Sequence, residues 1–323
     1  MNLGPEPSQA APVISLDIGG TSIRAAVVTL GPQPIVKYRL RTATLPQQGA
    51  SAVLQRALHL AAQAQQQAPA AVGAAVASAG VIGPGTGRVA FATELIPGWA
   101  GTEIGDAVTQ HLGLPCTVLN DVHAHGVGEF CFGQGAGSSS ALVVAVGTGL
   151  GGALFNAGEL IRGPSGHAGH LGHVHHATAR GLQCSCGRSG HLESVASGSG
   201  MHQRYGQLKR PHDPSAADGA AVVAHAYAGV APAEEVVRAG GAALGESLGS
   251  LANSWDPERI ILTGSVTGAG ELWWQELKNG YRSSAMEALR GRPLLRGSLG
   301  EDAPLLGGAA DHQESRGTEE RRW

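Results

Sequence analysis

Two segments of the chain follow the same pattern, in which an apolar strand ends in a glycine turn and a second apolar strand leaves it. The first covers residues 13–30 and the second covers residues 141–155. A unit that recurs in this way indicates two halves of similar structure. A chain of 323 residues, 42% of them hydrophobic, also exceeds the size at which a single core usually stops growing. We therefore expect an α/β protein with two lobes.

The spacing of apolar residues predicts strands and helices around the two turns. Runs of β-forming residues indicate strands, and apolar residues at intervals of three and four indicate helices. The predicted strands cover residues 13–17, 23–30, 35–40, 71–77, 117–120, 141–146, 153–155 and 260–262. The predicted helices cover residues 52–64, 103–112 and 234–252.

These elements also define the expected domains. Residues 1–12 have no periodicity and are expected to be a flexible leader, and residues 311–323 are charged and aperiodic and are expected to be a disordered tail. Between them we expect an N-terminal lobe over residues 13–118 and a C-terminal lobe over residues 119–310. The last helix is expected to pack back on the N-terminal lobe.

The charge and hydropathy of the chain argue against nucleic acid and membrane partners. The formal net charge is −3 with both signs interspersed, which provides no basic surface for a phosphate backbone. No run of about 18 apolar residues is present, and no export signal precedes Val13. Four cysteines in a chain of this length do not form a disulfide scaffold. We therefore expect a cytoplasmic protein.

The first glycine turn has the residues that a phosphate and its metal ion require. Gly19 and Gly20 let backbone N–H groups approach phosphate oxygens, and Thr21 and Ser22 can donate hydroxyl hydrogens. Asp17, at the end of the preceding strand, can hold Mg²⁺ through water. The same residues also fit an ordinary hairpin turn.

The second glycine turn strengthens this interpretation, because two such turns can clamp a nucleoside triphosphate between them. Its candidate residues are Gly147, Thr148, Gly149, Gly151 and Gly152. A third strand ends at Gly264, where the backbone could lie against a base or ribose. Taken alone, this third turn is no more than a loop.

Between the two turns, Asn120 and Asp121 follow an apolar strand. A carboxylate in this place, beside an amide that can bind a sugar hydroxyl, suits a general base that accepts the proton of an attacking alcohol. Asp121 could also serve only as the N-cap of the helix that follows, through Glu129.

Residues 167–191 contain a cluster of histidines and cysteines with the spacing of a metal site. His173, Cys184, Cys186 and His191 supply two imidazoles and two thiolates, which make a closed tetrahedral set of the kind that structural zinc uses. Such an ion would order the loop rather than activate water. Buried free thiols and surface histidines are the alternative.

Taken together and in order, these motifs resemble the ROK family (repressors, open reading frames and kinases) over residues 13–310. The segments that carry the resemblance are residues 17–21, 120–121, 147–152, 169–173 with 184–187 downstream, and 262–266. The resemblance implies an actin-like ATPase fold of two ribonuclease-H-like lobes around a nucleotide and sugar cleft. It also implies a sugar kinase that uses ATP and Mg²⁺, carries Zn²⁺ and forms a homodimer.

The resemblance further assigns roles to individual residues. Asp121 matches the catalytic base, and Asn120 matches a ligand of a sugar hydroxyl. His173 matches a zinc ligand that also neighbours the sugar, and Glu193 matches a second carboxylate that binds the sugar. The expected reaction is transfer of a phosphoryl group to the 6-hydroxyl of a hexose or N-acylated hexosamine.

Two residues depart from the usual family pattern. His191 stands where relatives usually have a third cysteine, which gives a zinc site of two cysteines and two histidines. His170 stands where many relatives have a glutamate that touches the sugar. The histidine form is similar to bacterial N-acetylmannosamine kinases, whereas glutamate is usual in glucokinases.

Other functions stay open at this stage. Sugar-sensing repressors of the family place a helix-turn-helix domain before the first glycine motif, and the dozen residues found there are too few for one. Glucokinase activity is an alternative to N-acetylmannosamine kinase activity. Polyphosphate is an alternative donor, because glycine turns hold phosphates without reading a base.

Overall fold

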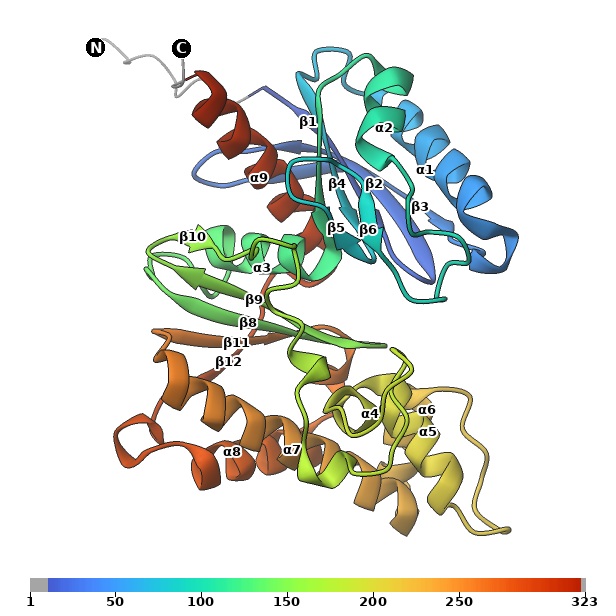
Figure 1. Ribbon diagram of the computed structural model, residues 1–323, viewed down its shortest axis with the longest axis vertical. Helices are drawn as coiled ribbons and strands as arrows, with labels where there is room; N and C mark the ends of the chain where they lie inside the picture. The colour runs from blue at the N-terminus through green and yellow to red at the C-terminus, as the bar shows by residue number, and fades with distance from the viewer. Residues whose placement is uncertain (1–10, 321–323) are drawn as a thin grey trace, which may run out of the picture. The chain divides into compact units, whose positions relative to one another are not determined.

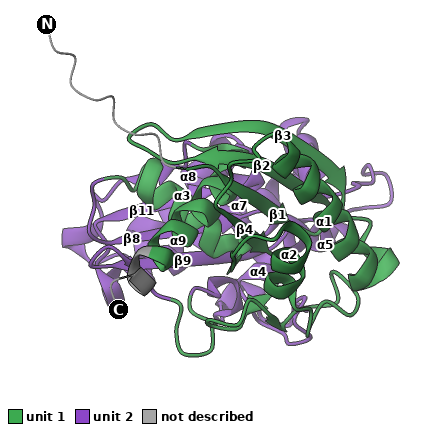
Figure 2. Cartoon of the chain, turned by 90° about the horizontal axis from the view of Figure 1, so that it is seen from above, with its two compact units in different colours: residues 1–136, 162–168, 299–323 green, residues 137–161, 169–298 purple. Residues whose placement is uncertain are grey.

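A computed structural model describes residues 11–320 of the chain, which form two compact units. Unit 1 takes residues up to 136 together with residues 162–168 and those from 299 onward, and unit 2 takes residues 137–161 and 169–298 (Figure 2). In the described residues, no helix combines the length and the apolar character that a membrane span requires.

Unit 1 is built on a five-stranded sheet with the order β3-β2-β1-β4-β7. Its first three strands form an antiparallel meander, and β4 and β7 continue the sheet parallel to β1. The strands are β1 (Val13–Ile18), β2 (Ser22–Thr29), β3 (Ile35–Ala43), β4 (Gly73–Ser78) and β7 (Cys116–Asn120), and a small hairpin adds β5 (Val81–Ile82) and β6 (Val89–Phe91). All the strands predicted for this part of the chain are confirmed.

Helices cover both faces of this sheet (Figure 1). They are α1 (Gly49–Gln66), α2 (Ile104–Leu112), α3 (Asp121–Phe132) and α9 (Ala303–Glu320), with single 3-10 turns η1 (Pro46–Gln48) and η6 (Gly300–Asp302). Strand β1 is buried on both sides, because Ile14 and Leu16 pack in the core beneath α1 while Val13 packs beneath α9. Ser15, on the α9 side, donates its hydroxyl to the carbonyl oxygen of Leu305 at 2.7 Å.

Helix α3 packs on α9 through two glycines. A Cβ atom at Gly128 would lie 2.2 Å from the carbonyl oxygen of Ala303, and one at Gly307 would lie 1.9 Å from that of Ala124. Since only glycine allows this approach, the two backbones lie in contact. This packing explains why unit 1 continues to residue 136, whereas the sequence analysis ends the first lobe at residue 118.

The C-terminal segment also differs from the expected disordered tail. Helix α9 continues through Glu320, and within it Asp311 and His312 are buried. Asp311 forms an ion pair with Arg162, and His312 lies against Gly73 at the start of β4. This part of α9 packs on the sheet through buried polar side chains, so it has no apolar periodicity from which a helix could have been predicted. Residues 1–10 of the predicted leader and residues 321–323 lie outside the described residues.

Unit 2 repeats the same sheet with the order β10-β9-β8-β11-β12. Strand β9 pairs antiparallel with both β10 and β8, and β11 and β12 continue the sheet parallel to β8. The strands are β8 (Ala141–Val146), β9 (Leu150–Asn156), β10 (Glu159–Leu160), β11 (Arg259–Thr263) and β12 (Leu294–Arg296). The helices are α4 (Glu193–Ala196), α5 (Gly198–Leu208), α6 (Gly219–Tyr227), α7 (Ala231–Trp255) and α8 (Glu271–Ser284), with 3-10 turns η2 (Leu171–His173), η3 (Ala177–Ala179), η4 (Ser265–Gly268) and η5 (Glu287–Leu289).

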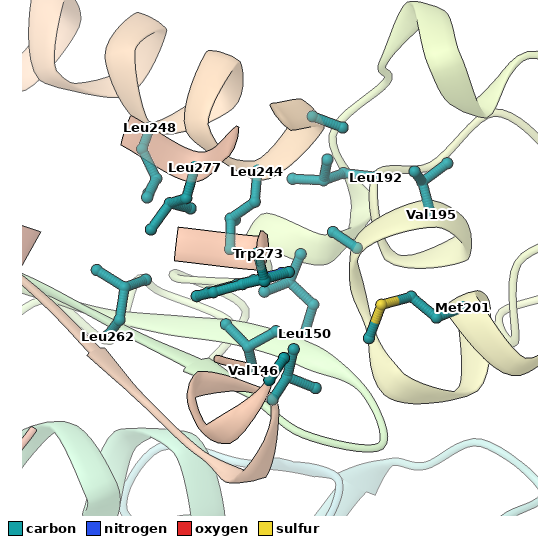
Figure 3. Close-up of a cluster of buried hydrophobic side chains, with 14 of the residues drawn as sticks. Val146, Leu150, Leu192, Val195, Met201, Leu244, Leu248, Leu262, Trp273 and Leu277 are labelled. Carbon is teal, nitrogen blue, oxygen red and sulfur yellow. The ribbon is translucent and has the colours of Figure 1, made fainter. Parts of the chain in front are cut away.

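The core of unit 2 lies between this sheet and the helices α7 and α8. Side chains from β8 and β11, such as Val146 and Leu262, point toward Leu244, Leu248 and Trp273 (Figure 3). The two helices approach closely along a row of glycines on α7, Gly241, Gly245 and Gly249, each of which lies against the backbone of α8 or its end. The predicted strands and the predicted helix of this unit are confirmed.

Candidate active site

In unit 1, the predicted site residues lie at one edge of the sheet. The register pairs Ile18 of β1 with Ser78 of β4, and Ser78 with Asn120 of β7. These three strands are parallel and end at the same level, so Asp17 and Asp121 come to the same edge. The carboxyl ends of parallel strands are where ligands of α/β sheets bind.

The turn between β1 and β2 is held in shape from outside. The N–H of Gly19 donates to the carbonyl oxygen of Ser22 at 3.0 Å, and the hydroxyl of Thr44 donates to that of Gly19 at 2.6 Å. The N–H of Thr44 donates to the carbonyl oxygen of Thr21 at 3.0 Å. A Cβ atom at Gly20 would lie 2.6 Å from the side chain of Leu95, so this backbone is in direct contact with the 92–99 loop.

Asp17 is buried and paired with an arginine that the sequence analysis did not identify. Arg24, on the neighbouring strand β2, donates from Nε and from one terminal nitrogen to Oδ2 of Asp17 at 2.9 and 2.6 Å. Burial raises the pKa of Asp17, and the guanidinium opposes this shift. The register pairs Asp17 directly with Arg24, a relationship that the hairpin pattern could have shown.

Asn120 is the N-cap of α3, where the sequence analysis considered Asp121 for that position. Its Oδ1 accepts from the N–H groups of Val122 and His123 at 3.0 and 3.1 Å. Its Nδ2 donates to the carbonyl oxygen of Gly80 and to Oδ1 of Asp121, both at 2.9 Å. The amide is therefore a structural element that also holds the neighbouring carboxyl group.

The environment of Asp121 raises the pKa of its carboxyl group to about 7. Burial, and secondly the charge of Asp17, raise this pKa, against opposing hydrogen bonds from Val122 and Asn120. The residue is the first of α3 and stays partly accessible at the surface of unit 1. A carboxyl group shifted in this way is a candidate for acid–base chemistry.

In unit 2, the second glycine turn consists of Gly147, Thr148 and Gly149, while Gly151 and Gly152 belong to strand β9. The start of α5 caps this turn: the N–H of Gly198 donates to the carbonyl oxygen of Gly147 at 2.8 Å. The third predicted turn is adjacent, because a Cβ atom at Gly264 would lie 2.5 Å from the carbonyl oxygen of Val146. The nucleotide candidates of this unit are thus brought together.

The histidine segment lies directly on β9. The N–H of Gly152 donates to the carbonyl oxygen of Gly169 at 2.7 Å, and a Cβ atom at Gly169 would lie 2.0 Å from the carbonyl oxygen of Gly152. Gly172 is equally close to the backbone of Leu150. This contact places His170 and His173 beside β9, the strand that follows the glycine turn. Their rings are stacked, with 5.9 Å between the ring centroids.

Glu193 joins the cysteine loop to the glycine turn. Its Oε2 accepts from the N–H of Leu150 at 3.0 Å, and its Oε1 accepts from the hydroxyl of Ser185 at 2.6 Å. The side chain is buried, and Oε2 lies 3.0 Å from the Cβ position of Gly149. This contact explains the glycine at that position.

The four predicted metal ligands converge in unit 2. The ligand atoms of His173, Cys184, Cys186 and His191 lie within 4.8 Å of one another. Cys184 Sγ lies 3.5 Å from His173 Nδ1, and Cys186 Sγ lies 3.3 Å from His191 Nδ1. Tetrahedral zinc, with bonds of about 2.0–2.3 Å, holds its ligand atoms roughly 3.3–3.8 Å apart. These two Cys–His distances match that spacing, and the four side chains are of the types that zinc binds. Burial lowers the pKa of His191, which favours the neutral imidazole that a metal ion requires.

Comparisons with known proteins agree with this architecture. The sequence matches the ROK family over residues 13–314. A glucokinase from Halalkalibacterium halodurans is 28% identical over 91% of this chain and 93% of its own length. An N-acetylmannosamine kinase from Yersinia pseudotuberculosis is 34% identical over 78% of this chain and 82% of its own length.

The fold has close structural neighbours as well. The crystal structure of a ROK family glucokinase from Streptomyces griseus, in complex with glucose and AMPPNP, superposes with a TM-score of 0.78 at 28% identity. The alignment covers 93% of this chain and 98% of that protein. The repeated sheets and these neighbours define an actin-like ATPase fold and the class of sugar kinases, as expected. The chain belongs to the ROK family.

Proposed function

We propose that this sugar kinase transfers the terminal phosphoryl group of ATP to the 6-hydroxyl of N-acetylmannosamine, with Asp121 as the general base. The observation that carries the proposal is the placement of Asp121 at the edge of the sheet, with its pKa raised to about 7. A base whose pKa lies near the working pH combines availability with driving force for proton transfer.

In the proposed reaction, the carboxylate of Asp121 accepts the hydrogen of the 6-hydroxyl while that oxygen attacks the terminal phosphorus. The bond between this phosphorus and the bridging oxygen breaks, and ADP leaves with the electron pair. Such a reaction depends mainly on alignment and on electrostatic stabilisation of the transferred group. Asn120 contributes to alignment, since its N–H holds Oδ1 of Asp121.

The phosphate-binding role rests on the two glycine turns. In unit 1 the residues are Asp17, Gly19, Gly20, Thr21 and Ser22, and in unit 2 they are Gly147, Thr148, Gly149, Gly151, Gly152 and Gly264. Magnesium would be held at Asp17, where both hydrogen bonds from Arg24 engage Oδ2 and leave Oδ1 available to a hydrated ion. The ion would neutralise phosphate charge.

Sugar recognition is assigned to Asn120, His170, His173 and Glu193. The preference for an N-acetylated sugar rests on His170, because an imidazole N–H can donate to the acetamido carbonyl oxygen. Zinc on His173, Cys184, Cys186 and His191 would order the loop that carries His170 and the contact between Ser185 and Glu193. We also propose that the protein is cytoplasmic and forms a homodimer. Light scattering on the purified protein measures the oligomeric state directly.

Glucokinase activity is the second candidate, since relatives of that name match nearly the whole chain. A coupled assay with N-acetylmannosamine, N-acetylglucosamine, glucose and mannose separates the two, with ATP and polyphosphate compared as donors. We expect the highest kcat/KM for N-acetylmannosamine with ATP. A higher kcat/KM for glucose would overturn the sugar assignment, and activity with polyphosphate alone would overturn the donor.

A further inference from the structure

Trp99 lies in the loop between β6 and α2 and is almost fully buried, with 1% of its surface exposed. Its indole N–H is donated to two acceptors at the end of β4, Oγ of Ser78 at 3.2 Å and the carbonyl oxygen of Ala79 at 3.1 Å. A hydrogen bond from a buried indole N–H restrains the orientation of the ring, and it also restrains the groups that accept the bond.

The acceptors of Trp99 belong to a backbone segment that reaches the proposed base. Ser78 is the register partner of Asn120 across β4 and β7. Two residues beyond Ser78, the carbonyl oxygen of Gly80 accepts one hydrogen of the Asn120 side-chain amide at 2.9 Å. The other hydrogen of the same Nδ2 is donated to Oδ1 of Asp121, also at 2.9 Å.

The segment from Ser78 to Gly80 leaves little room for adjustment. The N–H of Ala79 donates to the carbonyl oxygen of Ile18 at 3.0 Å, which connects the segment to the end of β1. Gly80 has a φ of 96°, and a Cβ atom there would lie 2.9 Å from the carbonyl oxygen of Phe91. The direction of the Gly80 carbonyl therefore depends on how the neighbouring peptide is held, and Trp99 is one of the groups that hold it.

We propose that Trp99 is a positioning residue for the proposed catalytic base, acting through the Ser78–Gly80 segment and Asn120 on the carboxyl group of Asp121. This inference rests on the proposed function, in which Asp121 accepts the proton of the sugar hydroxyl. Trp99 itself touches neither substrate nor nucleotide in this scheme. Its contribution is to fix the Gly80 carbonyl, and so to fix the amide that orients the base.

The chain contains a matched control. Trp273 is also fully buried, in the core of unit 2 (Figure 3), but its indole nitrogen has no hydrogen-bond partner among the described residues. The substitutions Trp99→Phe and Trp273→Phe therefore remove similar volume from buried sites. Only the first also removes hydrogen bonds, so its additional effect reports the role of the N–H group.

We expect Trp99→Phe to lower kcat about fivefold, the loss associated with a net hydrogen bond, with the KM for ATP unchanged. Trp273→Phe should keep kcat within about twofold of the wild type, since it removes packing volume in the core but no hydrogen bond. Thermal unfolding of both variants identifies any loss of folded protein. If Trp99→Phe fails to fold, Ser78→Ala removes one acceptor with a minimal change in volume and should lower kcat in the same way.

A double-mutant cycle with Asn120→Ala decides whether the effect travels through Asn120. In the Asn120→Ala background, Trp99→Phe should lower kcat by less than about twofold, because the connection is already broken. Equal fold losses in both backgrounds, or wild-type kcat in Trp99→Phe, would overturn the proposal. The outcome is separate from the base assignment, which Asp121→Asn tests directly.

Discussion

Asn120 donates one amide hydrogen to Oδ1 of Asp121 and the other to the carbonyl oxygen of Gly80, both at 2.9 Å. Its Oδ1 accepts from two N–H groups at the start of α3. The residue proposed to bind a sugar hydroxyl therefore already uses both of its amide hydrogens. A sugar hydroxyl that accepts from Nδ2 must therefore share a hydrogen with the Gly80 carbonyl oxygen or with Asp121 in a three-centre bond, which keeps the contact that orients the base.

The pH dependence of kcat/KM is expected to report the raised pKa of Asp121. The base must be ionised, so kcat/KM should fall below about pH 7, where the carboxyl group of the free enzyme becomes protonated. The measurement is a profile from pH 5 to 9 with sugar below KM. A profile that stays flat down to about pH 5 would contradict an elevated pKa for the base.

The raised pKa of Asp121 also affects the stability of the fold. Activity requires the ionised carboxylate, whereas stability is higher when the carboxyl group is protonated. Because the pKa of Asp121 is higher in the folded chain than in the unfolded chain, the protonated carboxyl group stabilises the fold at low pH. That contribution is lost as the pH rises toward about 7. Asp121→Asn, which mimics the neutral form, should be more stable than the wild type at pH 8 by on the order of 1–2 kcal/mol, and the difference should vanish near pH 4. Denaturant unfolding at both pH values is the test.

Local patterns in the sequence were sufficient to find eight of the strands and the glycine turns, but not the short strands β5, β6, β10 and β12. Apolar runs ended by Gly19 and Gly147 correspond to β1 and β8, because strand ends and turns depend on neighbouring residues. The packing of α3 on α9 was not found. It depends on Gly128 and Gly307, which are far apart in the chain, and no local pattern shows which backbone each glycine meets.

Only part of the candidate site could be predicted from the sequence, because some of its residues are brought together by the fold and not by a local pattern. The histidines and cysteines of the metal cluster have a recognisable spacing, and the hairpin register could also have paired Arg24 with Asp17, whereas Trp99 acts through partners that only loop packing brings near. Gly152 was assigned to phosphate binding from its place in a glycine-rich motif. In the fold it lies in β9 against Gly169, which gives that glycine a packing reason of its own.

Removal of zinc is expected to affect sugar binding before it unfolds unit 2. Cys184→Ser takes one ligand from a set whose atoms lie within 4.8 Å and should reduce zinc content below about a tenth of one ion per chain, with a rise of about tenfold in the KM for sugar. Cys131→Ser, at an exposed cysteine outside the cluster, is the control. Elemental analysis of protein purified without chelator should give one zinc per chain, and its absence would exclude the site.

Loss of Arg24 should destabilise unit 1 by about 3 kcal/mol, because it leaves the buried carboxylate of Asp17 without its partner. We expect Arg24→Met to show this loss in denaturant unfolding at pH 8, and to regain stability as the pH falls and Asp17 becomes protonated. The double variant with Asp17→Asn removes the unpaired charge and should recover most of the loss. Additive effects of the two substitutions would show that the ion pair has no net role.

The identity of residue 170 is expected to bias sugar selection. His170→Glu replaces a group that can donate to the acetamido carbonyl with one that only accepts, so the ratio of kcat/KM for N-acetylmannosamine to that for glucose should fall about fivefold. His167→Glu introduces the same charge at an exposed histidine three positions earlier and serves as the control. An unchanged ratio would move the origin of specificity to other residues.

The most direct test of the account is the kcat of Asp121→Asn with the best sugar substrate and saturating ATP. Asparagine keeps the shape of the side chain but cannot accept the proton, so kcat should fall by about 10² or more while KM for the sugar changes little. The unfolding transition of the variant at the assay pH verifies that it is folded. A folded variant that retains more than about a tenth of the wild-type kcat would contradict the role of Asp121 as the base.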